Sequence, residues 1–484
     1  MALNRSVSIS KNYMLLKPED VRFFDLIRIL FFRDIEKRKF VNCPEGIHEE
    51  PFKFRWLVFV SILAQKVLQC VSTPLAWFGN KIEMWLNLLS TNHGFFKLVW
   101  NFMLGKVVIP DKLSATYLSL YGHVDGRVEL DKNIKHGDSR YYGAFSVMAA
   151  KISYENKDYI KKTVEDLWKM EFLGFYDFWN EIQEKATSQV FMLRDKNVDP
   201  ELIVVAFRGT EPFDADAWCT DFDISWYDFP GMGKVHGGFI KALGLQKDAS
   251  LPEEIEKTND QHATAYYSIR DMLKDLLQTN EKSKFIVTGH SLGGALAILF
   301  PAVLALHKEE DLLKRLEGVY TFGQPRVGDD EFGEFMKEQL KNYSIPYYRF
   351  VYCNDIVPRL PYDDSTLTFK HFGTCLYYNS FYEGKVVEEE PNKNYFSPLS
   401  LLPKIINAIW ELIRSFIISY TKGPDYKEGG TLRVFRLIGL AIAGIPAHTN
   451  QEYVNCTRLG TPDLYQTVQD HVESTTNSDV PNIV

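Results

Sequence analysis

Hydrophobic and polar positions divide the chain into an apolar N-terminal part and a longer part in which strand and helix patterns alternate. Residues 56–79 carry a single formal charge, Lys66, over a length sufficient to span a bilayer. The lysine and Pro74 disfavour a simple spanning helix, and the aromatic richness up to about residue 105 is typical of membrane–water interfaces. We therefore predict a lipid-surface hairpin or a shallow insertion here. The alternative is a buried helical cap on the core.

From about residue 138 the pattern becomes that of an α/β domain. A helical pattern over 263–277 precedes an apolar strand, and a polar loop is predicted over 208–238. Strands that alternate with helices imply a largely parallel sheet, whose ligands lie at the carboxyl ends of the strands. The predicted strands are 189–194, 201–207, 284–288, 318–322 and 347–352.

A second apolar block, 395–420, predicts an amphipathic helix over 405–418. Its charged residues Lys404, Glu411 and Arg414 follow one another at intervals of seven and three residues, so they share one helical face. Such a helix either packs on a core or docks on lipid. A third apolar segment follows at 437–445, and the tail from about residue 472 is polar and predicted to be disordered.

These patterns predict three parts of the chain. The first is an N-terminal region, 1–137, whose apolar lipid-surface segment covers about 50–105. The second is an α/β domain, 138–471, with an amphipathic and hydrophobic insertion at about 395–445. The third is the polar tail, 472–484.

Charge and cysteine content exclude several classes of function. A net charge of −8 and a pI near 5.8 argue against a protein that binds nucleic acid. The six cysteines lack C-x-x-C spacing, so neither a zinc site nor a disulfide framework is indicated. The first ten residues lack the apolar core of a signal peptide, and we expect an intracellular, reduced protein.

The candidate chemistry centres on Gly289-His-Ser-Leu-Gly293, which directly follows the strand 284–288 and precedes a helical segment of small residues. Strand, G-x-S-x-G and helix form the context of a nucleophile elbow. The glycines leave room for a sharp turn that exposes the hydroxyl of Ser291. The N–H of Leu292 lies at the start of the helical segment, where it can stabilise negative charge. We predict that Ser291 is a nucleophile. The alternative is a glycine-rich turn with an N-cap serine.

A serine nucleophile requires an acid and a base, in the chain order serine, acid, histidine for α/β-hydrolase-like sheets. Asp355 follows the strand 347–352 directly and is the predicted acid. The alternatives are an ordinary Asn-Asp turn at this position, and Asp329 or Asp330 in a loop that shapes the site.

His448 is the predicted base, because it follows the acid and lies in a loop after apolar structure. His371 lies in an apparent strand, 367–372, which favours a structural role, and His471 borders the polar tail. His236 and His290 precede the acid, although His290 is placed to line the site beside the nucleophile.

The second oxyanion donor is expected after an earlier strand. Thr210 ends the segment that follows the strand 201–207 and offers both a backbone N–H and a hydroxyl. The polar and aromatic loop 211–230 comes next. We predict a lid that opens on a greasy surface; the alternative is an exposed loop whose aromatic side chains pack down.

The combination of these motifs resembles the class 3 (fungal-type) lipases over roughly residues 140–460. The segments 50–105 and 370–375 and the insertion before His448 resemble the plant oil-body triacylglycerol lipases. The motifs, in the order typical of the family, are Phe207-Arg-Gly-Thr210, Val235-His-Gly-Gly-Phe239, Gly289-His-Ser-Leu-Gly293, Tyr320-Thr-Phe-Gly-Gln-Pro-Arg-Val-Gly328, Asn354-Asp-Ile-Val-Pro358 and His448.

The resemblance implies an α/β-hydrolase fold with a mostly parallel sheet. It implies Ser291 as nucleophile, Asp355 as acid, His448 as base, and Thr210 and Leu292 as oxyanion donors. It further implies hydrolysis of acylglycerols, without a metal or cofactor, at the cytosolic side of a lipid-droplet or membrane surface.

Two other classes of function remain as alternatives. One is an enzyme with the same site and another substrate, a phospholipase A1 or a mono- or diacylglycerol lipase. The other is a non-catalytic, lipase-like signalling scaffold, but such proteins typically lack members of the triad, and here every motif is present. Acyl-chain preference and assembly into a homo-oligomer are left open by the sequence.

Overall fold

The computed structural model describes most of the chain. The described residues are 12–32, 39–43, 52–180, 185–245, 263–361, 363, 369–393, 395, 397, 400–461 and 464.

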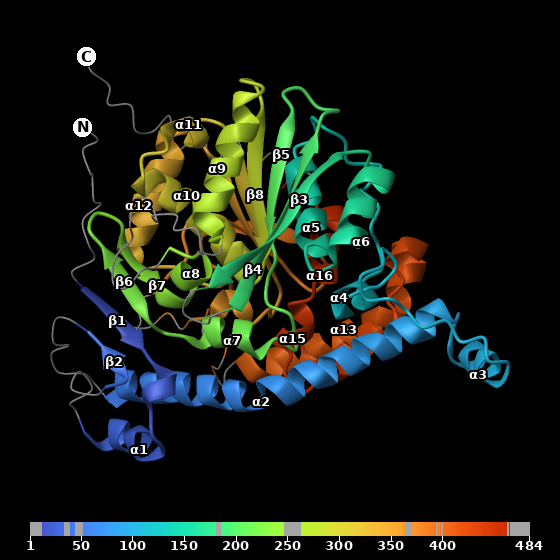
Figure 1. The fold of residues 1–484 in the computed structure, drawn as a ribbon, viewed down its shortest axis with the longest axis horizontal. Coiled ribbons are helices and arrows are strands. Elements are labelled where there is room, and N and C mark those ends of the chain that lie inside the picture. Colours follow the sequence, from blue (N-terminus) through green and yellow to red (C-terminus); the bar gives the residue numbers. More distant parts are fainter. Residues whose placement is uncertain are drawn as a thin grey trace.

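Within these residues, an eight-stranded sheet forms the centre of the molecule (Figure 1). Its five middle strands are parallel, and the strands toward its edges are antiparallel. The predicted α/β-hydrolase fold with a mostly parallel sheet is confirmed. In sheet order the strands are β12 (Gly384–Val387), β11 (Thr374–Tyr378), β10 (Tyr347–Tyr352), β9 (Leu316–Phe322), β8 (Lys284–His290), β5 (Leu202–Phe207), β4 (Lys185–Asp195) and β3 (Glu171–Asn180).

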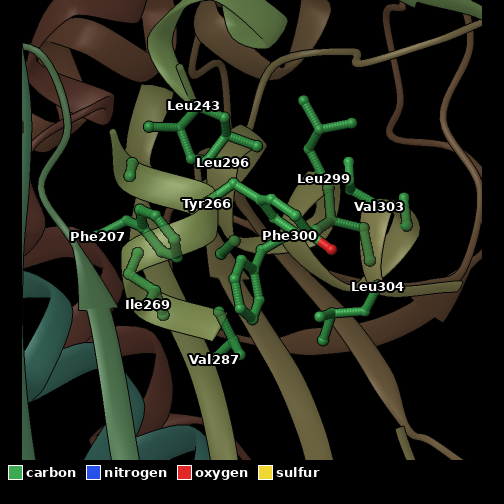
Figure 2. Close-up of a cluster of buried hydrophobic side chains, with 14 of the residues drawn as sticks. Phe207, Leu243, Tyr266, Ile269, Val287, Leu296, Leu299, Phe300, Val303 and Leu304 are labelled. Carbon is green, nitrogen blue, oxygen red and sulfur yellow. The ribbon is translucent and has the colours of Figure 1, made fainter. Parts of the chain in front are cut away.

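Both faces of the sheet are buried under helices, as parallel strands require. Along β5, Ile203, Val205 and Phe207 belong to one apolar layer, and Val204 and Ala206 belong to the other. The first layer includes α9 (Ala265–Gln278) and α10 (Leu292–Leu306), and Figure 2 shows its side chains packed around Phe300. The second layer includes α5 (Tyr141–Ile152) and α16 (Asn450–Leu459).

The polar loop predicted over 208–238 is wrong, because this segment contains a helix and a hairpin. The helix α7 (Ala215–Phe222) is capped by Asp214, whose side chain accepts a hydrogen bond from the N–H of Ala217. The hairpin strands β6 and β7 continue into α8, and β6 pairs with β1, a strand from the N-terminal part. That partner lies about two hundred residues away in sequence, so no local pattern reveals the strand. The bounds are β1 (Asn12–Leu16), β6 (Trp226–Phe229), β7 (Gly233–His236) and α8 (Gly237–Ala242).

Of the two arrangements predicted for the apolar N-terminal segment, the hairpin is wrong, and the shallow insertion stays a prediction. The helix α2 (Phe52–Thr91) runs without interruption for 40 residues, with Pro74 inside it. Proline removes one backbone donor, and tertiary contacts offset this loss, since α2 packs against α7 and α1 (Phe23–Phe31). Among the described residues, α2 is the one helix long and apolar enough to cross a membrane. A short helix, α3 (Phe95–Met103), follows it.

The amphipathic helix predicted in the insertion is present as α13 (Leu401–Thr421), and α14 (Gly430–Gly439) packs against it. In Figure 1, α2 and α13 lie along the same lower edge of the molecule. A strand predicted over 367–372 is not formed by residues 369–372, where Lys370 makes an isolated bridge to Gly328. The polar tail 472–484 lies outside the described residues, and the three-part division of the chain stays a prediction.

Candidate active site

Ser291 occupies a strained turn between β8 and α10. Its φ is 60° and its ψ is −131°, a conformation that residues other than glycine rarely adopt. A Cβ at Gly289 would lie 2.2 Å from the backbone of Gly293, and one at Gly293 would lie 2.3 Å from the carbonyl oxygen of Phe207. Both glycines are therefore required for the helix to approach the strands this closely. The turn is the predicted elbow.

The structure brings Ser291, His448 and Asp355 together in one hydrogen-bonded row. Ser291 Oγ lies 2.8 Å from Nε2 of His448, and Nδ1 of His448 lies 2.8 Å from Oδ2 of Asp355. The other carboxylate oxygen, Oδ1, accepts from the N–H of Val357 at 2.9 Å. When Nδ1–H donates to the carboxylate, Nε2 is left to accept the serine hydroxyl, as proton transfer from serine requires.

Secondary structure fixes the place of each member of this row. Asp355 follows the carboxyl end of β10, and Arg359 donates to its backbone carbonyl. His448 follows the short helix α15 (Gly444–Ala447) and precedes α16. All three side chains belong to buried residues, so solvent screens their interaction only weakly.

Tyr453 is a member of the site that sequence reasoning missed. Its hydroxyl donates to Oδ2 of Asp355, the oxygen that also faces His448. Burial, and then the neighbouring Asp355, hold the pKa of Tyr453 well above its usual range, so it stays a neutral donor. Tyr453 lies on α16, five residues after His448 (453 − 448), and no motif marks it.

His290 lines the site, as expected from its place beside Ser291. Its ring packs against the ring of His448, with centroids 4.5 Å apart, and its Nδ1 lies 2.8 Å from the hydroxyl of Tyr154. Burial, and then the charge of His448, hold the pKa of His290 well below its usual value. His290 is therefore a neutral neighbour of His448.

Thr210 lies beside the nucleophile. A Cβ on Gly209 would be 3.0 Å from Cβ of Ser291, so this glycine permits the close approach. The hydroxyl of Thr210 donates to Oδ2 of Asp221 on α7, at 2.9 Å. Burial raises the pKa of Asp221 to about 7, and its Oδ1 has no hydrogen-bond partner within the described part of the chain. Sequence reasoning missed Asp221.

Leu292 is the first residue of α10. Its N–H is one of the amides that a helix leaves without a partner in its first turn. Together with the N–H of Thr210, it supplies donors on two segments next to Ser291, whereas the hydroxyl proton of Thr210 is bonded to Asp221. Such donors can stabilise an oxyanion that develops on a carbonyl attacked by the serine.

The described rivals of the acid and base make structural contacts instead. Asp329 caps α12 (Asp330–Asn342) by accepting from the N–H of Phe332, and Asp330 pairs with Lys370. Nε2 of His371 lies 2.7 Å from the carbonyl oxygen of Pro358, so a structural histidine fits there.

Of the remaining rivals, His236 is buried and stacks on Phe239, with centroids 4.1 Å apart. Burial lowers its pKa to about 4. His471 lies outside the described residues. In the described part of the chain, no group of three His, Cys, Asp or Glu side chains is arranged to hold a metal ion.

A serine on a strand–turn–helix elbow, bonded to a histidine that is in turn bonded to an aspartate after the next-but-one parallel strand, defines the class of α/β-hydrolases. The family profile described as lipase (class 3) matches residues 204–365. The chain is 44% identical over 497 residues to triacylglycerol lipase OBL1 of Arabidopsis thaliana, covering 93% of this chain and 95% of that protein.

A protein of the same name from Nicotiana tabacum is 43% identical, with 84% of this chain and 83% of that protein covered. A crystal structure of a lipase from Rhizopus microsporus var. chinensis aligns with 55% of this chain and 84% of that one, at 23% identity and a TM-score of 0.38. The chain belongs to the class 3 lipases, in the group of these plant proteins, and the resemblance drawn from its motifs is confirmed.

Proposed function

We propose that this chain is a triacylglycerol lipase, a serine carboxylic-ester hydrolase that releases fatty acids from acylglycerols. The observation that carries the proposal is the continuous row from Ser291 Oγ through His448 to Asp355, with 2.8 Å at each step. It stands in a chain that is 44% identical, over almost its whole length, to a protein named for this activity.

In the proposed reaction, Ser291 Oγ attacks the carbonyl carbon of the ester while Nε2 of His448 takes the hydroxyl proton. Asp355 orients the imidazole and stabilises its charged form. The N–H groups of Leu292 and Thr210 donate to the oxyanion of the tetrahedral intermediate. When this intermediate collapses, the bond to the glycerol oxygen breaks and His448 gives that oxygen its proton.

An acyl group then remains on Ser291. Water attacks the acyl carbon while Nε2 of His448 takes a proton from the water. Collapse of the second intermediate breaks the bond to Ser291, which regains the proton from His448, and the fatty acid leaves. Tyr453 and Asp221 do not touch the reacting atoms. They position Asp355 and the hydroxyl of Thr210.

The substrate does not dissolve in water, so the enzyme must work at a lipid surface. We assign it to the cytosolic side of lipid droplets, attached through the N-terminal region 1–137 and its apolar segment at about 50–105. This assignment is supported by large exposed aromatic side chains on α2 and α3, a pattern typical of proteins that meet a lipid interface. They are Phe52, Trp56, Trp77, Phe78, Trp85, Phe95, Phe96, Trp100 and Phe102.

The test is fatty-acid release by the wild type and by Ser291→Ala from emulsified triolein, diolein and phosphatidylcholine. A matched control is Thr279→Ala, since Thr279 is exposed at the end of α9 and its hydroxyl bonds the carbonyl of Leu276. Release from triolein that is lost in Ser291→Ala and kept in the control supports the proposal. Release from phosphatidylcholine alone indicates a phospholipase, and no release by folded protein indicates a scaffold.

A further inference from the structure

In the helix α13 the charged residues are buried and apolar residues are exposed, the opposite of a surface helix in a soluble protein. Its three charged residues, Lys404, Glu411 and Arg414, are all buried. All residues of α13 are described, and its exposed face therefore carries no charged side chain. That face consists of large apolar side chains, whereas a helix packed on a water-soluble core shows the opposite arrangement. The most exposed are Leu401, Leu402, Ile406, Ile413, Phe416 and Tyr420.

The inward charges attach this helix to the core by hydrogen bonds. Arg414 on α13 and Arg436 on α14 both donate to the buried carboxylate of Glu452 on α16, at 2.9 and 2.6 Å. Arg436 also donates to both oxygens of Glu428, at 2.6 Å each. Burial raises the pKa of Glu411 to about 7, which brings the cluster close to neutrality. The hairpin α13–α14 is therefore tied to α16 through polar groups, and its apolar side remains outside.

The helix α2 shows part of this arrangement, although its buried side also includes Phe54, Val58 and Ile62, and Lys53 and Lys81 are exposed. Arg55, Ser61 and Gln65 are buried, and the hydroxyl of Ser61 donates to the carbonyl of Phe222 on α7 at 2.7 Å. Val60 and Val67, on the other side of the helix, are exposed. At 1.5 Å per residue, 40 residues extend for about 60 Å, roughly twice the thickness of a bilayer's hydrocarbon core. A helix of this length, bonded along the protein body, fits a position in the plane of a lipid surface.

We propose that α2, α13 and α14 form one surface that lies in the plane of a lipid layer, with apolar side chains in hydrocarbon and no helix crossing it. The proposal rests on the proposed function and names the partner: the phospholipid-coated surface of a triacylglycerol droplet. The segments 52–91 and 401–439, from the N-terminal and C-terminal parts of the chain, contribute to this surface. It lies on the side of the molecule where α7, which follows the carboxyl end of β5, packs on α2.

The connection from α14 to the base favours lipid over a protein partner. Leu440, Ile442 and Ile445 are exposed and lead within three residues to His448 (448 − 445). A protein seated on this surface would stand between the base of the triad and the lipid that holds a water-insoluble ester. Lipid in the same place supplies the ester directly from hydrocarbon, because the acyl chain then crosses no water.

The first experiment measures flotation of the full-length protein with triolein droplets coated with phosphatidylcholine. The variant Ile409→Glu/Ile413→Glu places two charges on the exposed face of α13. We expect flotation and triolein hydrolysis to fall by about tenfold or more, while hydrolysis of the soluble ester p-nitrophenyl butyrate stays within about twofold. Leu167→Glu is the matched control, because Leu167 is 50% exposed on η2 (Thr163–Leu167), which packs against α6 (Lys157–Lys162) and β3.

Wild-type flotation by the double variant would overturn the proposal, and light scattering would then show whether a second copy covers the surface. Loss of p-nitrophenyl butyrate hydrolysis in Ser291→Ala tests the proposed function separately, so the two failures are distinguishable.

A second measurement does not depend on the charged variant. Val60, Val71 and Trp85 share one face of α2 over about 38 Å of helix. A fluorophore is attached at each in turn by substitution to cysteine, with the exposed Cys70 replaced by serine. Quenching by brominated lipids reports the depth of the label. Equal shallow depths are expected, and a gradient along the helix would show a crossing and refute the in-plane surface.

Discussion

The hydroxyl of Tyr453 and Nδ1 of His448 share a single acceptor, Oδ2 of Asp355. Two hydrogen bonds to one carboxylate oxygen fix its position and partly neutralise its negative charge. Tyr453 lies on α16 and His448 lies just before this helix, so one segment of chain supplies both donors.

Replacing Tyr453 by phenylalanine removes one donor and leaves the ring in place. We expect kcat to fall by about tenfold, since a hydrogen bond to a charged group contributes about 1.5–3 kcal/mol. The carboxylate is then less neutralised and stabilises the imidazolium more, so the acid limb of the kcat/KM profile should move to higher pH. The profile is measured with a soluble ester, and Tyr420→Phe, at an exposed tyrosine, is the control.

A purely structural role for Tyr453 predicts another outcome. The Tm of Tyr453→Phe would then fall while the pH profile of the remaining activity matched the wild type. An unchanged profile would therefore refute the positioning role.

The choice of base is tested by comparing two buried histidines that both follow the acid in sequence. His448→Ala should lower kcat by about a thousandfold or more, because it removes the proton acceptor of Ser291. His371→Gln retains a donor for the carbonyl of Pro358 and should keep kcat within about threefold of the wild type when folded. Circular dichroism checks folding. The reverse pattern of activities would make His371 the base.

Local sequence was sufficient to predict much of the fold and the candidate triad. Ser291 and Asp355 each come directly after a strongly apolar strand, and parallel strands bring their carboxyl ends to one edge of the sheet. Gly289 and Gly293, on either side of Ser291, indicate a tight turn in which a larger side chain would clash. His448 could be predicted from chain order and sequence context. Of the two other histidines that follow the acid, His371 lies in an apparent strand and His471 borders the polar tail.

The missed features depend on contacts between segments far apart in sequence. Tyr453 and Asp221 have no motif, and each acquires its role only when α16 and α7 are placed against the elbow. The strand β6 needs β1 as its partner, and α2 continues through Pro74 because α7 packs along it. The direction of the charged face of α13 was likewise undetermined, since a helical pattern shows that charges share a face and not whether that face is buried.

From the geometry of the elbow we expect substitutions of two adjacent glycines, Gly293 and Gly294, to reduce stability by very different amounts. In Gly293→Ala the new Cβ would lie 2.3 Å from the carbonyl oxygen of Phe207, a backbone atom of a central strand. We expect a loss of about 3 kcal/mol or more in the free energy of unfolding, together with loss of esterase activity. Gly294→Ala is the milder comparison, because its Cβ would lie 3.1 Å from Cβ of Gln324, 3.2 Å from the carbonyl oxygen of Gly289 and 3.3 Å from Cβ of Thr321, so much smaller shifts relieve its contacts. Equal stability of the two variants in urea unfolding would show that the elbow tolerates a side chain.

Asp221 predicts a pH dependence of stability with a definite sign. Burial raises its pKa from 3.8 to about 7, so the folded protein keeps a proton that the unfolded chain loses above pH 4. The folded state binds more protons in this window, and the contribution of Asp221 to stability therefore falls as pH rises from about 4 to 7 and is constant above that range. Asp221→Asn carries no titrating proton and still accepts from the hydroxyl of Thr210. Its Tm relative to the wild type should rise by about 2 °C or more between pH 4 and pH 7. A difference in Tm that does not change with pH would show that Asp221 is ionised throughout this range.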